Sequence, residues 1–101
     1  MTVLHVALQD GFVNDKVIIL VNGEEVFHQS DIKTKFQIGL AKSFEVPVSS
    51  GSARIQVQIP SKSLSETVDL EIQESPLYLG VSVTPDRQIS LQVSQEPFRY
   101  M

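Results

Sequence analysis

Apolar and polar residues alternate one by one through much of this chain, and this alternation constrains the fold more than any other feature of the sequence. The clearest runs are residues 54–59, 67–73, 77–84 and 88–93. Successive side chains of a strand point to opposite faces, so these runs predict strands with one buried face. Turn residues separate the runs every eight to twelve residues, a spacing typical of a β-sandwich or a small barrel.

The densest apolar run belongs to an expected β-hairpin over residues 16–29. Asn22-Gly23 divides this stretch into two strand-like halves. Both residues tolerate the positive φ angles of a type I′ turn, which makes Asn-Gly the strongest short hairpin signal. We therefore expect two paired strands on either side of this dipeptide.

Both faces of the first hairpin strand are apolar. A two-residue loop would place Ile18 opposite Phe27 and Leu20 opposite Glu25. A strand with one face in water normally has a polar face. The strand is therefore predicted either to be central and covered on both sides or to contact another molecule through its second face.

The rest of the chain adds further expected elements. Residues 3–8 predict a first strand, and Phe12 in the following turn is expected to close one end of the core. Residues 30–42 allow a capped helical turn or a short strand, of which we favour an edge strand over 36–42. Pro47 lacks a backbone N–H, so the strand that contains it is also predicted to lie at an edge.

Together these elements predict an all-β protein, an antiparallel β-sandwich of eight or nine short strands. The 101 residues correspond to a single domain, residues 1–101, with an apolar C-terminal tail over residues 95–101. The expected architecture resembles immunoglobulin-like or transthyretin-like sandwiches at the level of the fold. The Cys-Trp-Cys pattern of true immunoglobulin domains is absent, because the chain has no cysteine and no tryptophan.

Charge and composition narrow the possible partners. The chain has 8 basic and 12 acidic residues and a net charge of −4. A nucleic-acid partner requires a concentrated basic face, so nucleic acid and anionic membranes are not expected as partners. The absence of cysteine is compatible with a reducing compartment, and no apolar run is long enough to span a bilayer. We therefore expect a cytoplasmic protein.

The functional prediction is a non-catalytic protein-interaction or accessory domain, with a homodimer as the expected form of self-association. No nucleophile elbow, phosphate-binding loop or zinc-protease motif is present, and no cofactor is expected. The two histidines are interpreted as structural. The candidate interface residues are the apolar side chains of the hairpin and of the tail: Ile18, Leu20, Phe27, Phe98, Tyr100 and Met101.

The alternative hypothesis is a small ligand-binding module. Oxygen ligands in a turn suit calcium, and Asp10, Asn14, Asp15 and Asp86 are the candidate ligands if their loops meet at one end of the sandwich. Asp, Asn and Gly are also the ordinary residues of turns, which is the interpretation we favour. Carbohydrate is the other candidate ligand, although Tyr78 alone on a polar strand face provides a poor stacking platform.

Overall fold

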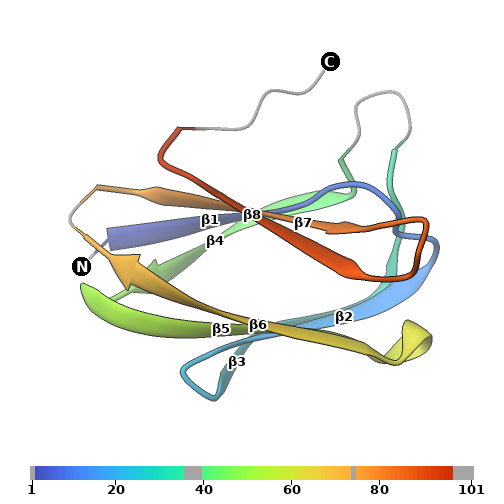
Figure 1. Ribbon diagram of the computed structural model, residues 1–101, viewed down its shortest axis with the longest axis horizontal. Helices are drawn as coiled ribbons and strands as arrows, with labels where there is room; N and C mark the ends of the chain where they lie inside the picture. Colours follow the sequence, from blue (N-terminus) through green and yellow to red (C-terminus); the bar gives the residue numbers. More distant parts are fainter. Residues whose placement is uncertain (1, 36–39, 74, 97–101) are drawn as a thin grey trace.

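Two four-stranded sheets face each other in the computed structural model, which describes residues 2–35, 40–73 and 75–96 (Figure 1). The strands are β1 (Thr2–Leu8), β2 (Asp15–Val21), β3 (Glu24–Ile32), β4 (Lys42–Val48), β5 (Gly51–Ile59), β6 (Leu64–Ile72), β7 (Leu77–Val83) and β8 (Ile89–Ser94). A single turn of 3-10 helix, η1 (Pro60–Lys62), connects β5 to β6. The predicted all-β sandwich is confirmed.

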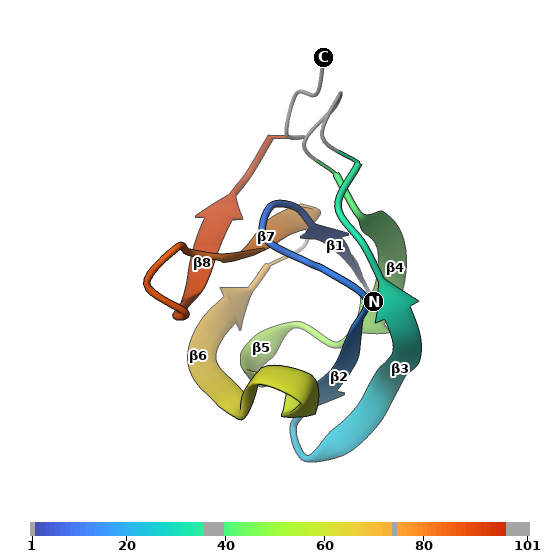
Figure 2. The same cartoon turned by 90° about the vertical axis from the view of Figure 1, so that its right-hand side faces the viewer.

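The order of strands is β4-β1-β7-β8 in one sheet and β3-β2-β5-β6 in the other. Every neighbouring pair is antiparallel except β1 and β7, which run parallel, so the prediction of a wholly antiparallel sandwich is wrong at this pair. Figure 2 shows the two open sides of the sandwich, where β8 lies over β6 and β4 lies over β3. The described part of the chain therefore has four edge strands: β3, β4, β6 and β8.

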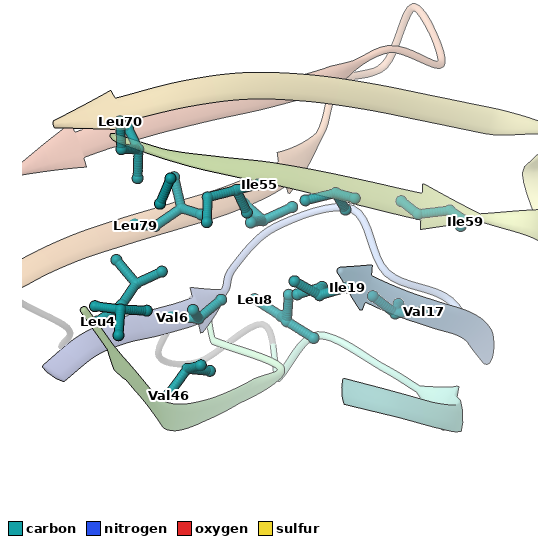
Figure 3. Packing of buried hydrophobic residues seen from close by; sticks show 14 of the residues in the cluster. Leu4, Val6, Leu8, Val17, Ile19, Val46, Ile55, Ile59, Leu70 and Leu79 are labelled. Atoms are coloured by element: carbon teal, nitrogen blue, oxygen red, sulfur yellow. The ribbon is translucent and has the colours of Figure 1, made fainter. Parts of the chain in front are cut away.

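The core consists of alternate aliphatic side chains from the facing sides of the two sheets (Figure 3). The side chains with no more than 1% of their surface exposed are Leu4, Val6, Leu8, Phe12, Val17, Ile19, Ile55, Val57, Ile59, Leu79 and Val81. Burial of each such side chain contributes about 1.5–3 kcal/mol. A core of this size stabilises the fold without a disulfide.

Phe12 closes one end of the core, as the sequence predicts, with 1% of its surface exposed. The buried Thr34 fixes this loop: its Oγ1 accepts a hydrogen bond from the Phe12 N–H at 3.1 Å and donates one to the Gln9 carbonyl at 2.6 Å. Gly11 has a φ of +90°, and a Cβ there would lie 2.1 Å from the Val83 carbonyl oxygen. Glycine is therefore required in this turn by both its backbone angle and its surroundings.

The hairpin forms at Asn22-Gly23, but its predicted register is only partly correct. Leu20 faces Glu25 as expected, whereas Ile18 faces His28 rather than Phe27. The ladder shifts by one residue between Ile19 and Leu20, because a β-bulge inserts an extra residue in β3. This bulge moves the side chain of Phe27 to the inner face of the sheet.

The strand β2 is central, as one of the two alternatives predicts, but only one of its two apolar faces is completely covered. β2 lies between β3 and β5, and its inner residues Val17 and Ile19 are fully buried. Its outer residues Ile18 and Leu20 are half-buried rather than covered by a second layer of the same chain. The strand is thus flanked on both edges and covered completely on one face.

The segment after the hairpin differs from the prediction. β3 continues to Ile32, and Lys35 and Leu40 form an isolated antiparallel bridge. Residues 36–39 lie outside the described residues, and the described residues nearby contain no strand before Lys42. Most of the expected edge strand over 36–42 therefore lies outside the described residues. Within its described part, Leu40 forms the bridge and Lys42 begins β4. Pro47 does lie in an edge strand, β4, as predicted.

The polar stretch over residues 60–65 predicts a loop, but β6 already begins within it, at Leu64. Pro60 starts the 3-10 turn, and Ser63 ends it in the left-handed conformation, with a φ of 56°. This tight reversal returns the chain directly to pairing with β5, so the connection is shorter than its polar sequence indicates. Within the described residues, no helix is long and apolar enough to cross a membrane.

Candidate functional site

The loops that contain the acidic turn residues lie at one end of the sandwich. Asp10 lies beside the end of β7, because the Val83 N–H donates a hydrogen bond to the Asp10 carbonyl at 2.8 Å. Asp86 lies in the turn directly after this contact, and Asp15 begins β2 beside η1. The same end appears at the right of Figure 1.

The carboxylate of Asp15 is already fully engaged by the protein itself. Its side chain is 3% exposed and forms an ion pair with the ammonium of Lys62. It also accepts hydrogen bonds from the Ser61 hydroxyl at 2.7 Å and the Val13 N–H at 2.9 Å. These donors come from η1 and from the β1–β2 loop, so Asp15 joins two connections that are distant in the sequence.

The electrostatics of this cluster favour the ionised carboxylate. Burial on its own raises the pKa of Asp15, since it penalises the charged form. The hydrogen bonds from Lys62, Val13 and Ser61, together with the charge of Lys62, outweigh burial and hold the pKa below its ordinary value of 3.8. The cluster is thus a stabilising ion pair whose oxygens already have donors.

The other predicted calcium ligands do not gather around Asp15. Asp10, Asn14 and Asp86 are all exposed. In residues 2–35, 40–73 and 75–96, no group of three His, Cys, Asp or Glu side chains is arranged to hold a metal ion. Asn14 has a φ of 52°, a turn conformation that asparagine tolerates. This geometry agrees with the turn interpretation.

The candidate interface residues of the hairpin lie on two different faces. Ile18 and Leu20 point outward and are half-buried among Gln56 and Gln58 of β5. Phe27 points inward and stacks on Phe44 of β4, with ring centroids 4.2 Å apart and an interplanar angle of 7°. The three residues therefore do not form one apolar patch. Phe98, Tyr100 and Met101 lie outside the described residues.

The Phe27–Phe44 pair covers the side of the sandwich between β3 and β4. The two rings belong to different sheets, so their contact bridges the layers at one open margin. Stacked aromatic pairs contribute about 0.5–1.5 kcal/mol beyond the area that they bury. The two rings therefore cover part of this side of the molecule.

Tyr78 does not offer a free stacking platform on the outer face of its sheet. Its ring stacks on His5 of the neighbouring β1, with centroids 4.5 Å apart. His5 in turn lies 3.6 Å from the carboxylate of Glu45 on β4. The two histidines of the chain lie in different sheets, on β1 and β3, so they do not form a joint site.

Two shallow hollows of the described surface lie near the hairpin. One, of about 690 Å³, lies beside the Arg54–Asp69 ion pair, in which Arg54 Nε and Asp69 Oδ1 are 3.0 Å apart. A second, of about 220 Å³, lies between the tips of β2–β3 and β4–β5. Ser52, Arg54 and Asp69 line the first hollow, and the Asp69 carboxylate is held in its ion pair with Arg54.

Three of the four edge strands carry features that discourage pairing with another strand. β4 contains Pro47 and charged residues, and β3 is interrupted by two register shifts and bears acidic residues. β6 contains Glu66, Asp69 and Glu71. Prolines, bulges and charges are the usual means by which natural proteins prevent edge-to-edge association.

The fourth edge strand, β8, has none of these features. Its sequence, Ile-Ser-Leu-Gln-Val-Ser, contains no charge and no proline, and its pairing with β7 is regular throughout. Ile89 and Leu91 are half-buried, and Val93 is 44% exposed. These three side chains belong to the inner row, because they pair with the buried Val83, Val81 and Leu79.

The margin of β6 below β8 is also partly open, and we call this side the β6–β8 seam. Its apolar residues are Leu64 and Val68 of β6 with Ile89, Leu91 and Val93 of β8. Glu66 pairs with the fully buried Val57, which places it in the inner row, yet Glu66 itself is exposed. Solvent therefore reaches the inner row of β6 at this point.

Sequence reasoning missed two features: the ion pair that Asp15 forms with Lys62, and the position of β8 at a sheet edge. The side-chain partners of Asp15, Ser61 and Lys62, are 46 and 47 residues away in the chain, so no local sequence pattern predicts them. The uncharged sequence of β8 was visible, but its edge position follows only from the order of strands. No protein-family model and no curated protein matches the chain, so its function must be argued from the fold and its surfaces.

Proposed function

We propose that the chain is a non-catalytic protein-interaction domain that receives an additional β-strand at the free edge of β8. The observation that supports this proposal is the contrast between the edges: β8 is the one edge strand among those described that has no charge, proline or bulge. An unguarded edge presents unpaired backbone groups that a second strand can bind.

The β6–β8 seam supplies the side-chain part of the same site. In β-strand addition, backbone hydrogen bonds provide affinity and alternate side chains provide specificity. A strand added beside β8 would cover Val93, which is 44% exposed, and would extend the apolar inner row. The expected ligand is an extended segment that alternates apolar and uncharged polar residues.

We also propose that the fold is an immunoglobulin-like or transthyretin-like sandwich. The two facing four-stranded sheets support this part of the proposal. We propose a cytoplasmic location as well, which the cysteine-free sequence supports. The net charge of −4 supports a protein partner over nucleic acid. The shallow hollows support a role without catalysis.

A selection from short random peptides displayed on phage tests the proposed function. Peptides that bind the wild-type chain are expected to share the alternating pattern and to shift the amide resonances of β8. Val93→Lys should abolish their binding, because it places a charge in the inner row of the receiving edge. Val26→Lys is the matched control, since Val26 is 37% exposed on the guarded edge strand β3.

Peptides that bind both lysine variants equally would show that β8 is not the receiving edge. A failure to select any peptide above background would count equally against the proposed function.

A further inference from the structure

The β8 strand is complementary to itself, and we propose that its partner is the β8 strand of a second copy of the chain. This inference rests on the proposed function and specifies the partner. The two strands would run antiparallel about a two-fold axis at Leu91. The β4-β1-β7-β8 sheets of the two copies would then form one continuous sheet across the dimer. Such an interface is isologous, as in most homodimers.

The pairing that this axis creates matches side chains on both faces of the strand. On the inner face Leu91 meets its own copy, and Ile89 meets Val93 of the second copy. On the outer face Ser90 meets Gln92 of the second copy. All six residues of β8 are uncharged, so the register brings apolar residues together on one face and polar residues together on the other.

Charge favours this self-pairing over the others that the fold allows. Two β3 strands paired over their full length would place Glu25 opposite Asp31 of the second copy. Two β6 strands would collect Glu66, Asp69 and Glu71 of both copies along one strand pair. Like charges directly opposite each other destabilise a strand pair. In a chain of net charge −4, β8 offers an edge where two copies meet without acidic side chains in the strand pair.

The size of the contact sets the expected strength. A stable protein interface buries about 1,200–2,000 Å² in total. A pair of six-residue strands lies at or below the lower end of that range. The dimer should therefore form in a concentration-dependent manner in the micromolar range or above, without any added ligand.

Sedimentation velocity of the full chain from micromolar to millimolar concentration measures this association. The wild-type chain should change from monomer to dimer, and Val93→Lys should weaken dimerisation by about tenfold or more, because the two-fold axis introduces each substitution twice. Val26→Lys should associate like the wild type. Circular dichroism of each variant confirms that it is folded before the comparison.

Disulfide cross-linking tests the register, since the chain has no native cysteine. Leu91→Cys should form a covalent dimer on mild oxidation, because two copies of residue 91 face each other across the axis. Val93→Cys is the matched control: its two copies are offset by four residues, about 13 Å along the strand. A disulfide requires Cα atoms within about 7 Å, so this variant should stay monomeric on a non-reducing gel.

Each outcome decides the proposal. A wild-type chain that stays monomeric at every concentration would overturn the second copy as partner, while peptides that bind at β8 would leave the proposed function standing. A dimer that Val93→Lys does not weaken, or a cross-link at residue 93 in place of 91, would also overturn it. Association lost in Val93→Lys together with a cross-link at residue 91 would establish it.

Discussion

Replacement of Lys62 by methionine isolates the contribution of the buried ion pair between β2 and η1. The Met side chain fills a similar volume but leaves the carboxylate of Asp15 without its cation. Asp15 is 3% exposed, so water cannot replace the lost partner. The folded state should therefore be destabilised, and by more than the loss of an exposed ion pair would predict.

The structure sets the magnitude of this effect. Removal of one partner from a buried ion pair costs about 3–5 kcal/mol. The Lys62 side chain is 18% exposed. In the variant, the Ser61 hydroxyl and the Val13 N–H would still donate hydrogen bonds to Asp15. We therefore expect the lower end, about 3 kcal/mol, which corresponds to a fall in melting temperature of about 12–24 °C for a domain of this size.

Urea unfolding at neutral pH measures the loss, with Lys33→Met as a control at an exposed lysine. The double variant Asp15→Asn/Lys62→Met should recover part of the stability, because it leaves no buried charge without a partner. A loss of less than about 1 kcal/mol in Lys62→Met would refute the reasoning, since that is the range of exposed ion pairs.

The pH dependence of stability provides a second reading of the same pair. The pKa of Asp15 is lowered in the folded state, so its contribution is present above the ordinary value of 3.8 and is lost as the pH falls through the folded pKa. The wild-type chain should therefore lose stability in acid below about pH 4. Asp15→Asn should lose less over the same interval, and an identical loss would contradict the assignment.

Three further perturbations address other parts of the fold. Gly11→Ala should destabilise the chain by about 2 kcal/mol or more, because its Cβ would collide with a β7 carbonyl, and unchanged thermal unfolding would contradict this. A double-mutant cycle of Phe27→Leu and Phe44→Leu should give a coupling of about 0.5–1.5 kcal/mol, and a coupling near zero would show that the rings contribute only by burial. Calcium should leave the melting temperature unchanged, and a rise that Asp10→Asn abolishes would revive the ligand-binding alternative.

The two-layer fold could be predicted from the sequence because its signals are local. The alternation over residues 54–59 and 77–84 and the turn at Asn22-Gly23 each specify a strand or a turn by themselves. Pro47 gave the edge position of β4 for the same reason, since a missing N–H is a property of one residue. These elements all appear in the structure.

The features that were missed depend on contacts between distant segments. The β3 bulge moves Phe27 inward to reach Phe44, 17 residues further along the chain, and no pattern within the hairpin indicates this partner. The loop expected after Pro60 is shortened by the left-handed Ser63. The prediction that Ile18, Leu20 and Phe27 form one interface depends only on the face to which each side chain points. A shift of one residue in the pairing exchanges the two faces.

The parallel pairing of β1 with β7 has a consequence for the order of folding. β1 occupies residues 2–8 and its parallel neighbour residues 77–83, so their sheet cannot be completed until most of the chain has been synthesised. The β2–β3 and β5–β6 hairpins pair residues close in sequence and need no such wait. We expect pulsed hydrogen exchange to detect protection in these hairpins before β1, and simultaneous protection would contradict this order. Of the eight described strands, β1 is thus synthesised first and is among the last to complete its pairing.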